Sequence, residues 1–240
     1  MTRRPSGIWA EEDDKPLPEP TFFRKIFEDL WEGLFVLVVW GFVLWCLGLV
    51  AIYASLVFLP LGLFVVALTV APGLAGLMFA CAKLARGGFI RLGDVWRGTF
   101  RLYWRSVVMA LPLAVMGTLI WITMDIVRVH PERQEMALSL ALQVGIVLTA
   151  AVLSVYVYPV LALYDTRPQK TVLLAGVLAT RFIWQTLVLM ILGLVLLTAT
   201  MLHPLVWLFI FGPWCVVATN TTYRLARRIL PDAEQSAIDK

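Results

Sequence analysis

Charged side chains are scarce in this chain of 240 residues, and they are absent from four long stretches of it. Asp, Glu, Lys and Arg make up 15% of the residues, while 60% are hydrophobic. None of the four charged types occurs in residues 33–82, 106–124, 136–164 or 182–223. About a quarter of an ordinary soluble domain is charged, and about 20 apolar residues are enough to cross a bilayer. The composition therefore excludes an ordinary soluble domain and indicates a protein embedded in a membrane.

Cysteine and histidine are also rare, which limits metal and redox chemistry. The three cysteines, Cys46, Cys81 and Cys215, lie in charge-free stretches without a Cys-x-x-Cys spacing, so we interpret them as small packing residues. The two histidines, His130 and His203, belong to different loops. The carboxylates near them in the sequence are Asp125, Glu132 and Glu135. No spacing connects the two loops, so we interpret these side chains as ordinary polar loop residues and not as a metal site.

Motifs of catalysis and nucleotide binding are missing from the sequence as well. It has no phosphate loop, no G-x-G-x-x-G, no H-E-x-x-H and no G-x-S-x-G. The charge-free stretches hold no carboxylate or base, although coupled carriers usually place one there. Among their polar residues, Asn220 has two interpretations: a hydrogen bond between helices, which we prefer, or substrate binding. We therefore predict that the chain is not an enzyme and has no cofactor and no bound metal.

Two prolines divide the longest charge-free stretches. Pro60 interrupts residues 33–82 and Pro204 interrupts residues 182–223, so each stretch is long enough for two crossings. We predict six transmembrane helices at about 34–57, 61–82, 106–125, 137–162, 182–201 and 205–223. Each must pair its own backbone groups in hydrocarbon, and none has the alternating pattern of a barrel strand. The predicted fold class is therefore an all-α membrane protein with six spans.

The distribution of Lys and Arg predicts the orientation of the chain. With six spans, the N-terminal tail, residues 83–105, residues 165–181 and the C-terminal tail share one side, which holds 18 of the 20 basic residues. The opposite side keeps Arg128 and Arg133. Because cytoplasmic loops carry the excess of basic residues, both termini are predicted to be cytoplasmic. The excess of Lys and Arg over Asp and Glu thus reflects the orientation of the chain in the membrane. We predict no nucleic-acid partner.

The chain divides into four segments by composition. Residues 1–20 are acidic and rich in proline and are predicted to be disordered. Residues 21–32 alternate apolar and charged residues at helical spacing, as in an amphipathic helix on the membrane surface. Residues 33–223 form the membrane domain, and residues 224–240 form a cytoplasmic C-terminal tail.

A second amphipathic segment, an elbow helix, is predicted within residues 83–105. Leu92, Val95, Trp96, Phe100 and Tyr103 form one stripe. Arg97, Arg101 and Arg105 follow at intervals of four, and Trp96 and Trp104 suit the interface between headgroups and water. The predicted contacts of Arg97, Arg101, Arg105, Trp96 and Trp104 are anionic lipid headgroups or a partner protein. Simple anchoring of the cytoplasmic side is the plainer interpretation.

Three prolines suggest an internal repeat. A basic residue follows eleven positions after each of Pro72, Pro159 and Pro213, which places each proline about 16 Å from the basic end and near mid-membrane. Our hypothesis is that the chain contains three related helical hairpins, with helix kinks at these prolines. Chance is the competing explanation, because such residues are common in membrane helices.

Two stretches of the chain resemble the YesL-like family of small bacterial membrane proteins. One contains VAPGLAGL at 70–77, KLARG at 83–87 and DVWR at 94–97 with Phe100; the other contains YPVLALYD at 158–165, followed later by Gly212-Pro213. The similarity covers roughly residues 25–228. It implies six spans in the bacterial plasma (inner) membrane and an association with sugar uptake. The family implies no catalytic residues.

Two functions remain open at this point. The first, which we prefer, is an accessory or interaction subunit of a larger membrane complex, in contact with anionic lipids and other membrane proteins. The second is a small-solute transporter or permease component, for example for a sugar, with a pocket at the level of the prolines. An intramembrane enzyme is disfavoured because no acid–base or nucleophile constellation is present.

Overall fold

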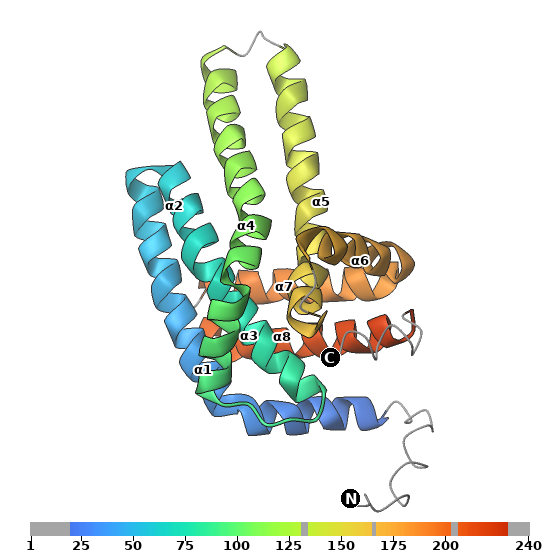
Figure 1. Ribbon diagram of the computed structural model, residues 1–240. Helices are drawn as coiled ribbons and strands as arrows, with labels where there is room; N and C mark the ends of the chain where they lie inside the picture. Colours follow the sequence, from blue (N-terminus) through green and yellow to red (C-terminus); the bar gives the residue numbers. More distant parts are fainter. Residues whose placement is uncertain (1–19, 131–133, 165–166, 203–205, 230–240) are drawn as a thin grey trace, which may run out of the picture.

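The computed structural model describes residues 20–130, 134–164, 167–202 and 206–229, and all its regular elements within these ranges are helices (Figure 1). They are α1 (Pro20–Val57), α2 (Leu59–Val65), the π-helical turn η1 (Val66–Val70), α3 (Ala71–Ala85), α4 (Leu92–Val129), α5 (Gln134–Tyr164), α6 (Pro168–Arg181), α7 (Ile183–Leu202) and α8 (Val206–Arg227). The predicted all-α class is confirmed. Residues 1–19 of the predicted N-terminal tail and residues 230–240 of the predicted C-terminal tail, together with Glu132 and His203, lie outside the described residues. The first residues of that C-terminal tail, from Arg224 to Arg227, belong to α8.

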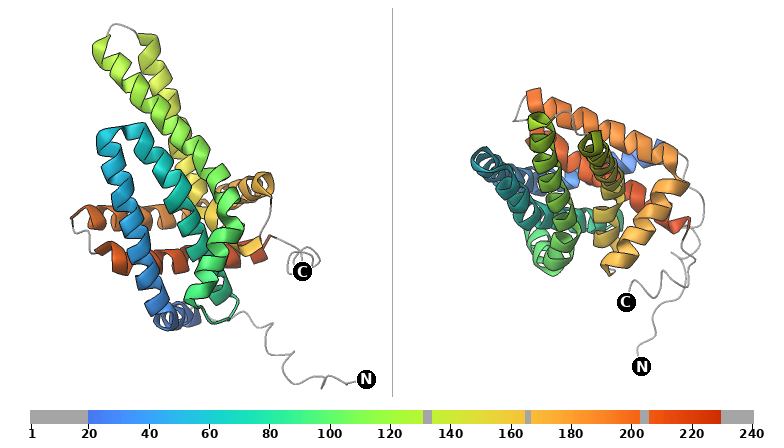
Figure 2. Two further views of the ribbon diagram at one scale, coloured as in Figure 1. Left: turned by 60° about the vertical axis from the view of Figure 1, so that its left-hand side comes forward. Right: turned by 90° about the horizontal axis from the view of Figure 1, so that it is seen from above.

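Helix α1 has two parts that run in different directions. Its first part lies across one end of the fold, and the helix then turns and rises beside α2 (Figures 1 and 2). The rising part, Gly33–Val57, is long and apolar enough to cross a membrane. The predicted surface helix at 21–32 is thus helical and continuous with the first span. The side chains of residues 21–29 lie outside the described part, so its predicted apolar face stays a prediction.

The second span is built from α2, η1 and α3 in one run, Leu59–Ala85. Pro60 lies in the first turn of α2, where its missing N–H is not needed, as the sequence predicts. Pro72 lies in the first turn of α3, directly after the π-helical turn. A proline cannot donate to the preceding turn, and a π-helical turn is one way in which a helix accommodates a local change in its hydrogen-bond ladder.

The α4–α5 hairpin is the longest feature and extends beyond the α1–α2 hairpin (Figure 1). At 1.5 Å per residue the 38 residues of α4 are about 57 Å long, well above the roughly 30 Å of a hydrocarbon core. The predicted elbow helix is therefore not a separate element: residues 92–105 are the first turns of α4 itself. No proline lies between Leu92 and Leu111 to end the helix before the span.

The last three helices have a different direction. Helices α6, α7 and α8 run crosswise to α4 and α5 at the end of the molecule that also holds the turn between α3 and α4 (Figures 1 and 2). Helices α6 and α7 meet at an angle of 101° around Phe182. The described residues contain four spans by length and composition, or five if this bent pair is one broken span, so the six predicted spans are not confirmed.

The proposed repeat of three hairpins is not confirmed either. The α1–α2 and α4–α5 hairpins rise side by side, whereas α7 and α8 run across their lower halves (Figures 1 and 2). Pro159 and Pro213 both lie inside helices, α5 and α8 respectively, as does Pro112 in α4. Their predicted role as kinks stays a prediction.

The core lies where α8 crosses α1, α3 and α5. Its fully buried side chains include Leu37, Leu77, Met78, Tyr156, Val160 and Val216. Cys81 and Cys215 are buried in the same cluster, as expected for packing residues, and Cys46 is half-buried. At this core α8 packs against residues of the candidate spans themselves: a Cβ atom added at Gly212 would lie 2.7 Å from Leu37 of α1, and Thr219 lies against Met78 of α3.

Candidate functional site: an aromatic and basic surface on α4

The turn between α3 and α4 determines how the first residues of α4 are presented. Gly87 adopts a positive φ of 82°, which a side chain would disfavour. After the turn, a carboxylate oxygen of Asp94 lies 2.8 Å from the Lys83 ammonium and accepts the backbone N–H of Arg91 at 3.0 Å. An acidic residue here also suits the positive end of the helix dipole. These contacts orient the start of α4 relative to α3.

A second contact connects this turn to α5. The guanidinium of Arg86 donates a hydrogen bond to the carbonyl of Leu163, in the last turn of α5. Carbonyl groups in the last turn of a helix lack partners within the helix, and a cation there is stabilising. The start of α4 is thus part of a rigid base that includes α3 and α5.

Close packing of α3 on α4 buries one face of these first turns. A Cβ atom added at Gly76 would lie 2.0 Å from the Thr99 hydroxyl oxygen and 2.7 Å from the carbonyl oxygen of Val95, so the two helices touch through their backbones. Val95 and Leu102 are fully buried on this face. The single aromatic stripe of the sequence prediction is therefore divided: Val95 faces the core, and Trp96 and Phe100 face outward.

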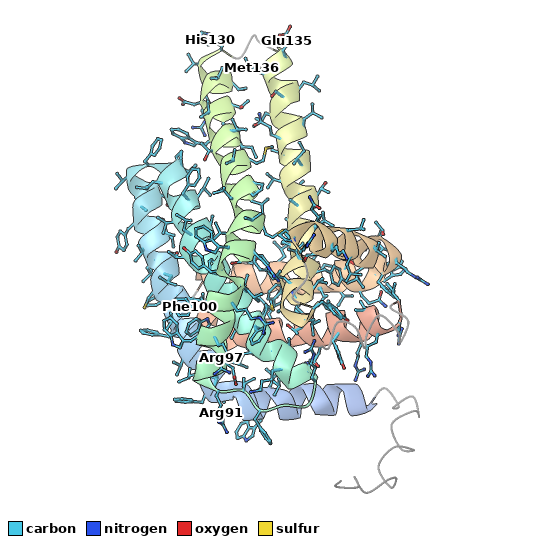
Figure 3. All side chains as sticks on the ribbon, in the orientation of Figure 1. Arg91, Arg97, Phe100, His130, Glu135 and Met136 are labelled. Atoms are coloured by element: carbon cyan, nitrogen blue, oxygen red, sulfur yellow. The ribbon has the colours of Figure 1, made fainter. Side chains whose placement is uncertain are left out.

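The outward face carries two parallel rows, which we call the α4 double stripe. Its aromatic row is Trp96, Phe100 and Trp104, which are 51%, 72% and 74% exposed. Its basic row is Arg97, Arg101 and Arg105, of which the first two are exposed and the third is half-buried. The sequence-predicted contact residues thus lie together on three turns of one helix. Figure 3 shows Arg97 and Phe100 near the end of α4 that follows Arg91 and is remote from His130.

The aromatic row is supported from behind by α1. The ring of Trp96 stacks on Phe100 with a centroid distance of 5.9 Å and meets the edge of Trp40 at 5.1 Å. The buried indole N–H of Trp40 donates to the carbonyl of Gly73, at 2.9 Å. The support that Trp40 gives to Trp96 could not be predicted from the spacing of residues within one helix.

The polar residues of α8 are used for packing. Asn220 donates to the carbonyl of Val216 at 3.1 Å, and the Thr222 hydroxyl donates to that of Ala218 at 2.7 Å. The Thr219 hydroxyl lies 3.2 Å from the sulfur of Met78. All three α8 residues are buried. Asn220 is therefore buried in the core, but its hydrogen bond lies within α8 and not between two helices as the preferred interpretation expected.

The end of the α4–α5 hairpin remote from Arg91 carries several exposed polar residues. His130 and Glu135 are exposed on either side of residues 131–133 (Figure 3), and Asp125 is exposed on α4. Within the ranges that the structure describes, no three His, Cys, Asp or Glu side chains gather as a metal site would require.

A groove lies between α4, α5 and α6. It has a volume of about 250 Å³ and is lined by Val108, Met109, Pro112, Leu113, Met116, Ile146, Ala150, Leu153, Ser154, Val157, Tyr158 and Val172. Only Ser154 and Tyr158 contribute hydroxyl groups. The signal that could have revealed it, the stripe Met109, Pro112 and Met116 on α4, resembles any apolar membrane helix.

Comparison of the chain with known protein families, curated proteins and solved structures finds no match. The arrangement of residues on α4 is therefore the main basis for a functional conclusion.

Proposed function

We propose that this chain is a non-catalytic multi-pass membrane protein that acts as an accessory or interaction subunit of a larger membrane complex. The observation that carries the proposal is the α4 double stripe. Trp and Arg are the residue types that dominate the binding energy of protein interfaces. The stripe ends at Arg105, directly before the charge-free residues 106–124, so it emerges from the lipid tails. Three exposed aromatic rings in that position favour a docking site for a partner.

The rigidity of the stripe supports a role in recognition. Trp96 and Phe100 are stacked on each other, and Trp96 rests on the buried Trp40. A preformed surface loses less conformational entropy on binding than a mobile one. Simple membrane anchoring would not need the rings to be fixed in this way.

We place the end of the molecule that carries the α3–α4 turn in the cytoplasm, with four spans formed by α1, α2–α3, α4 and α5. The basic residues divide 18 to 2 between the two ends under this four-span arrangement as under a six-span one. Four and six are both even numbers of spans, so in both arrangements the C-terminal part of the chain lies on the same side as the N-terminus. A six-span arrangement would require α7 and α8 to turn upright. The bacterial plasma membrane and the kinship to the YesL-like family are part of the same proposal, and rest on the motifs at 70–97 and 158–165.

The alternative function, a small-solute carrier, depends on the groove between α4, α5 and α6. A sugar needs several convergent hydrogen-bonding groups in its site, and this groove offers two hydroxyls in a lining of Met, Leu, Val, Ile, Pro and Ala. The lining therefore favours an apolar occupant. Uptake of a labelled sugar into proteoliposomes that contain only this chain would support the carrier instead.

The interaction hypothesis is tested by crosslinking and co-purification from the native membrane. A photoreactive benzoylphenylalanine in place of Phe100 is expected to form one discrete adduct with a protein, and the same group in place of Phe58, exposed at the α1–α2 tip, should not. The partner identified by this crosslink should co-purify with the unmodified chain in mild detergent. It should be lost from the Trp96→Ala, Phe100→Ala double variant. A monomer without adducts at position 100 would contradict the proposal.

A further inference from the structure

The groove between α4, α5 and α6 is open toward the first turn of α6. A shallower depression of about 460 Å³, lined by Met109, Pro168, Gln169, Val172 and Leu173, adjoins it. Met109 and Val172 line both spaces, so the two are continuous. The groove therefore leads from the interior of the membrane domain to the end of the molecule where α6 begins.

The length of the groove matches one leaflet of a bilayer. On α5 its lining extends from Ile146 to Tyr158, a rise of about 18 Å. Half of the hydrocarbon core is roughly 15 Å. A transmembrane helix of a partner would need a groove about twice as long, whereas one acyl chain of a phospholipid fits this length.

The chemistry of the lining also suits an acyl chain. Met109 and Met116 are flexible and polarisable and can adapt to an irregular chain. The Ser154 hydroxyl is bonded to its own helix at the carbonyl of Ala151, at 2.7 Å. The Tyr158 hydroxyl has no hydrogen-bond partner among the residues that the structure describes, and Tyr158 borders the groove, so it can donate to an ester carbonyl.

The mouth of the groove is basic. Arg105 lies one helical turn before Met109, on the stripe of α4 that continues as Pro112 and Met116. Arg167 directly precedes the first turn of α6, and Arg167 and Lys170 are both exposed. That first turn contains no acidic residue. Along the chain, Arg105 is thus within one helical turn of Met109, and Arg167 and Lys170 directly flank Pro168 and Gln169, which line the opening. The positive end of the α6 dipole lies at the same turn.

We propose that this groove binds one anionic phospholipid, with an acyl chain between α4 and α5 and the phosphate group at Arg105, Arg167 and Lys170. The ligand is a lipid of the leaflet on the α6 side, which the proposed function places in the cytoplasm. The inference deepens that function, because a bound lipid would connect the base of the α4–α5 hairpin to α6. It rests on the proposed orientation but not on the existence of a protein partner.

The test compares two phospholipids on the purified full chain by native mass spectrometry after delipidation. Phosphatidylglycerol and phosphatidylcholine with identical acyl chains are titrated in the same detergent. The double variant Arg167→Gln with Lys170→Gln should weaken phosphatidylglycerol binding by roughly 25-fold, at about fivefold per charge, and should leave phosphatidylcholine unchanged. Filling the groove with Ala150→Phe should weaken both lipids, because it displaces the acyl chain. Val172→Phe, from the α6 wall, is the second filling variant if Ala150→Phe does not fold.

Two matched controls decide between this site and non-specific adsorption. Arg227→Gln with Arg228→Gln removes two exposed charges from the end of α8, and Ala151→Phe adds the same ring one residue from the groove, on an exposed position. Neither control should change the affinity for either lipid. Equal losses in the two charge variants, or unchanged binding in both filling variants, would overturn the proposal. The proposal of a protein partner is tested by crosslinking at Phe100 and by co-purification. The lipid proposal is tested by mass spectrometry of the isolated chain, so failure of one can be distinguished from failure of the other.

Discussion

The hydroxyl groups of Tyr156 and Thr186 lie 3.1 Å apart in the buried region between α5 and the start of α7. Thr186 also lies within hydrogen-bond distance of two backbone carbonyls, that of Phe182 at 2.9 Å and that of Ala179 at 3.3 Å. Ala179 belongs to α6 and Phe182 lies at the 101° bend between α6 and α7, while Thr186 itself belongs to α7. Thr186 therefore joins both arms of the bend to α5.

The first prediction concerns this threonine. Thr186→Val keeps the shape of the side chain and removes every hydrogen bond of its hydroxyl, so we expect a loss of about 1 kcal/mol in the free energy of unfolding in detergent. Tyr156→Phe removes one of these bonds and should cost about 0.6 kcal/mol. Thr198→Val is the control, because Thr198 is exposed and bonds only to the carbonyl of Leu194 in its own helix.

A double-mutant cycle separates the contact from general effects on the helices. The combined Tyr156→Phe and Thr186→Val variant should lose less than the sum of the single losses, because the bond between them is removed only once. Exact additivity would mean that the two hydroxyls do not interact in the folded protein.

The second prediction compares two glycines. Gly76→Ala should destabilise the fold by about 1–3 kcal/mol or more, since the new methyl group meets the backbone of α4 at Val95 and Thr99. Gly145→Ala on α5 should cost nothing and gain up to about 1 kcal/mol, because open space surrounds that position and alanine favours a helix. Thermal unfolding of the two variants in one detergent makes the comparison. Equal stability of the two variants would contradict the close packing of α3 on α4.

The third prediction concerns the direction of α7. Val188 and Val195 are both exposed on α7 and seven residues apart, as are Val108 and Val115 on α4. Spin labels at 108 and 115 should differ in bilayer depth by about 10 Å, because the proposed arrangement has α4 cross the membrane. Labels at 188 and 195 should lie at similar depths, because α7 is crosswise to α4 (Figure 1). A difference of about 10 Å for the α7 pair as well would show that α7 crosses the membrane, and would support the six-span arrangement.

The fourth prediction concerns thiol reactivity and orientation. Cys81 and Cys215 are fully buried and should stay unreactive toward maleimides until the protein unfolds, whereas the half-buried Cys46 should react slowly. In a Cys46→Ala background, Gly88→Cys should be labelled by an impermeant maleimide only after the cells are opened. His130→Cys should be labelled in intact cells. Labelling of position 88 from outside would reverse the proposed orientation.

Some of these features can be predicted from single segments. Pro60 starts a helix because its missing N–H is harmless there, and the spacing of Arg97, Arg101 and Arg105 puts them on one face of any helix. Trp96 and Phe100 were expected in the same stripe as Val95, however, and only the contact of α3 with α4 turns Val95 inward. The groove at Met109 and Val172 could not be predicted, because it is formed by three helices that meet only in the tertiary structure.

The sequence by itself determined that most of this chain is apolar helix, where each apolar stretch begins and ends, and which ends of the stretches carry the basic residues. Hydrophobicity and charge act on each segment separately, so these properties can be predicted without knowledge of any tertiary contact. The tertiary structure alone decided that α7 and α8 lie crosswise and that residues 92–105 continue into a span. The direction of an apolar helix depends on which neighbours it packs against, and an apolar stretch of sequence is compatible with lipid and with protein alike.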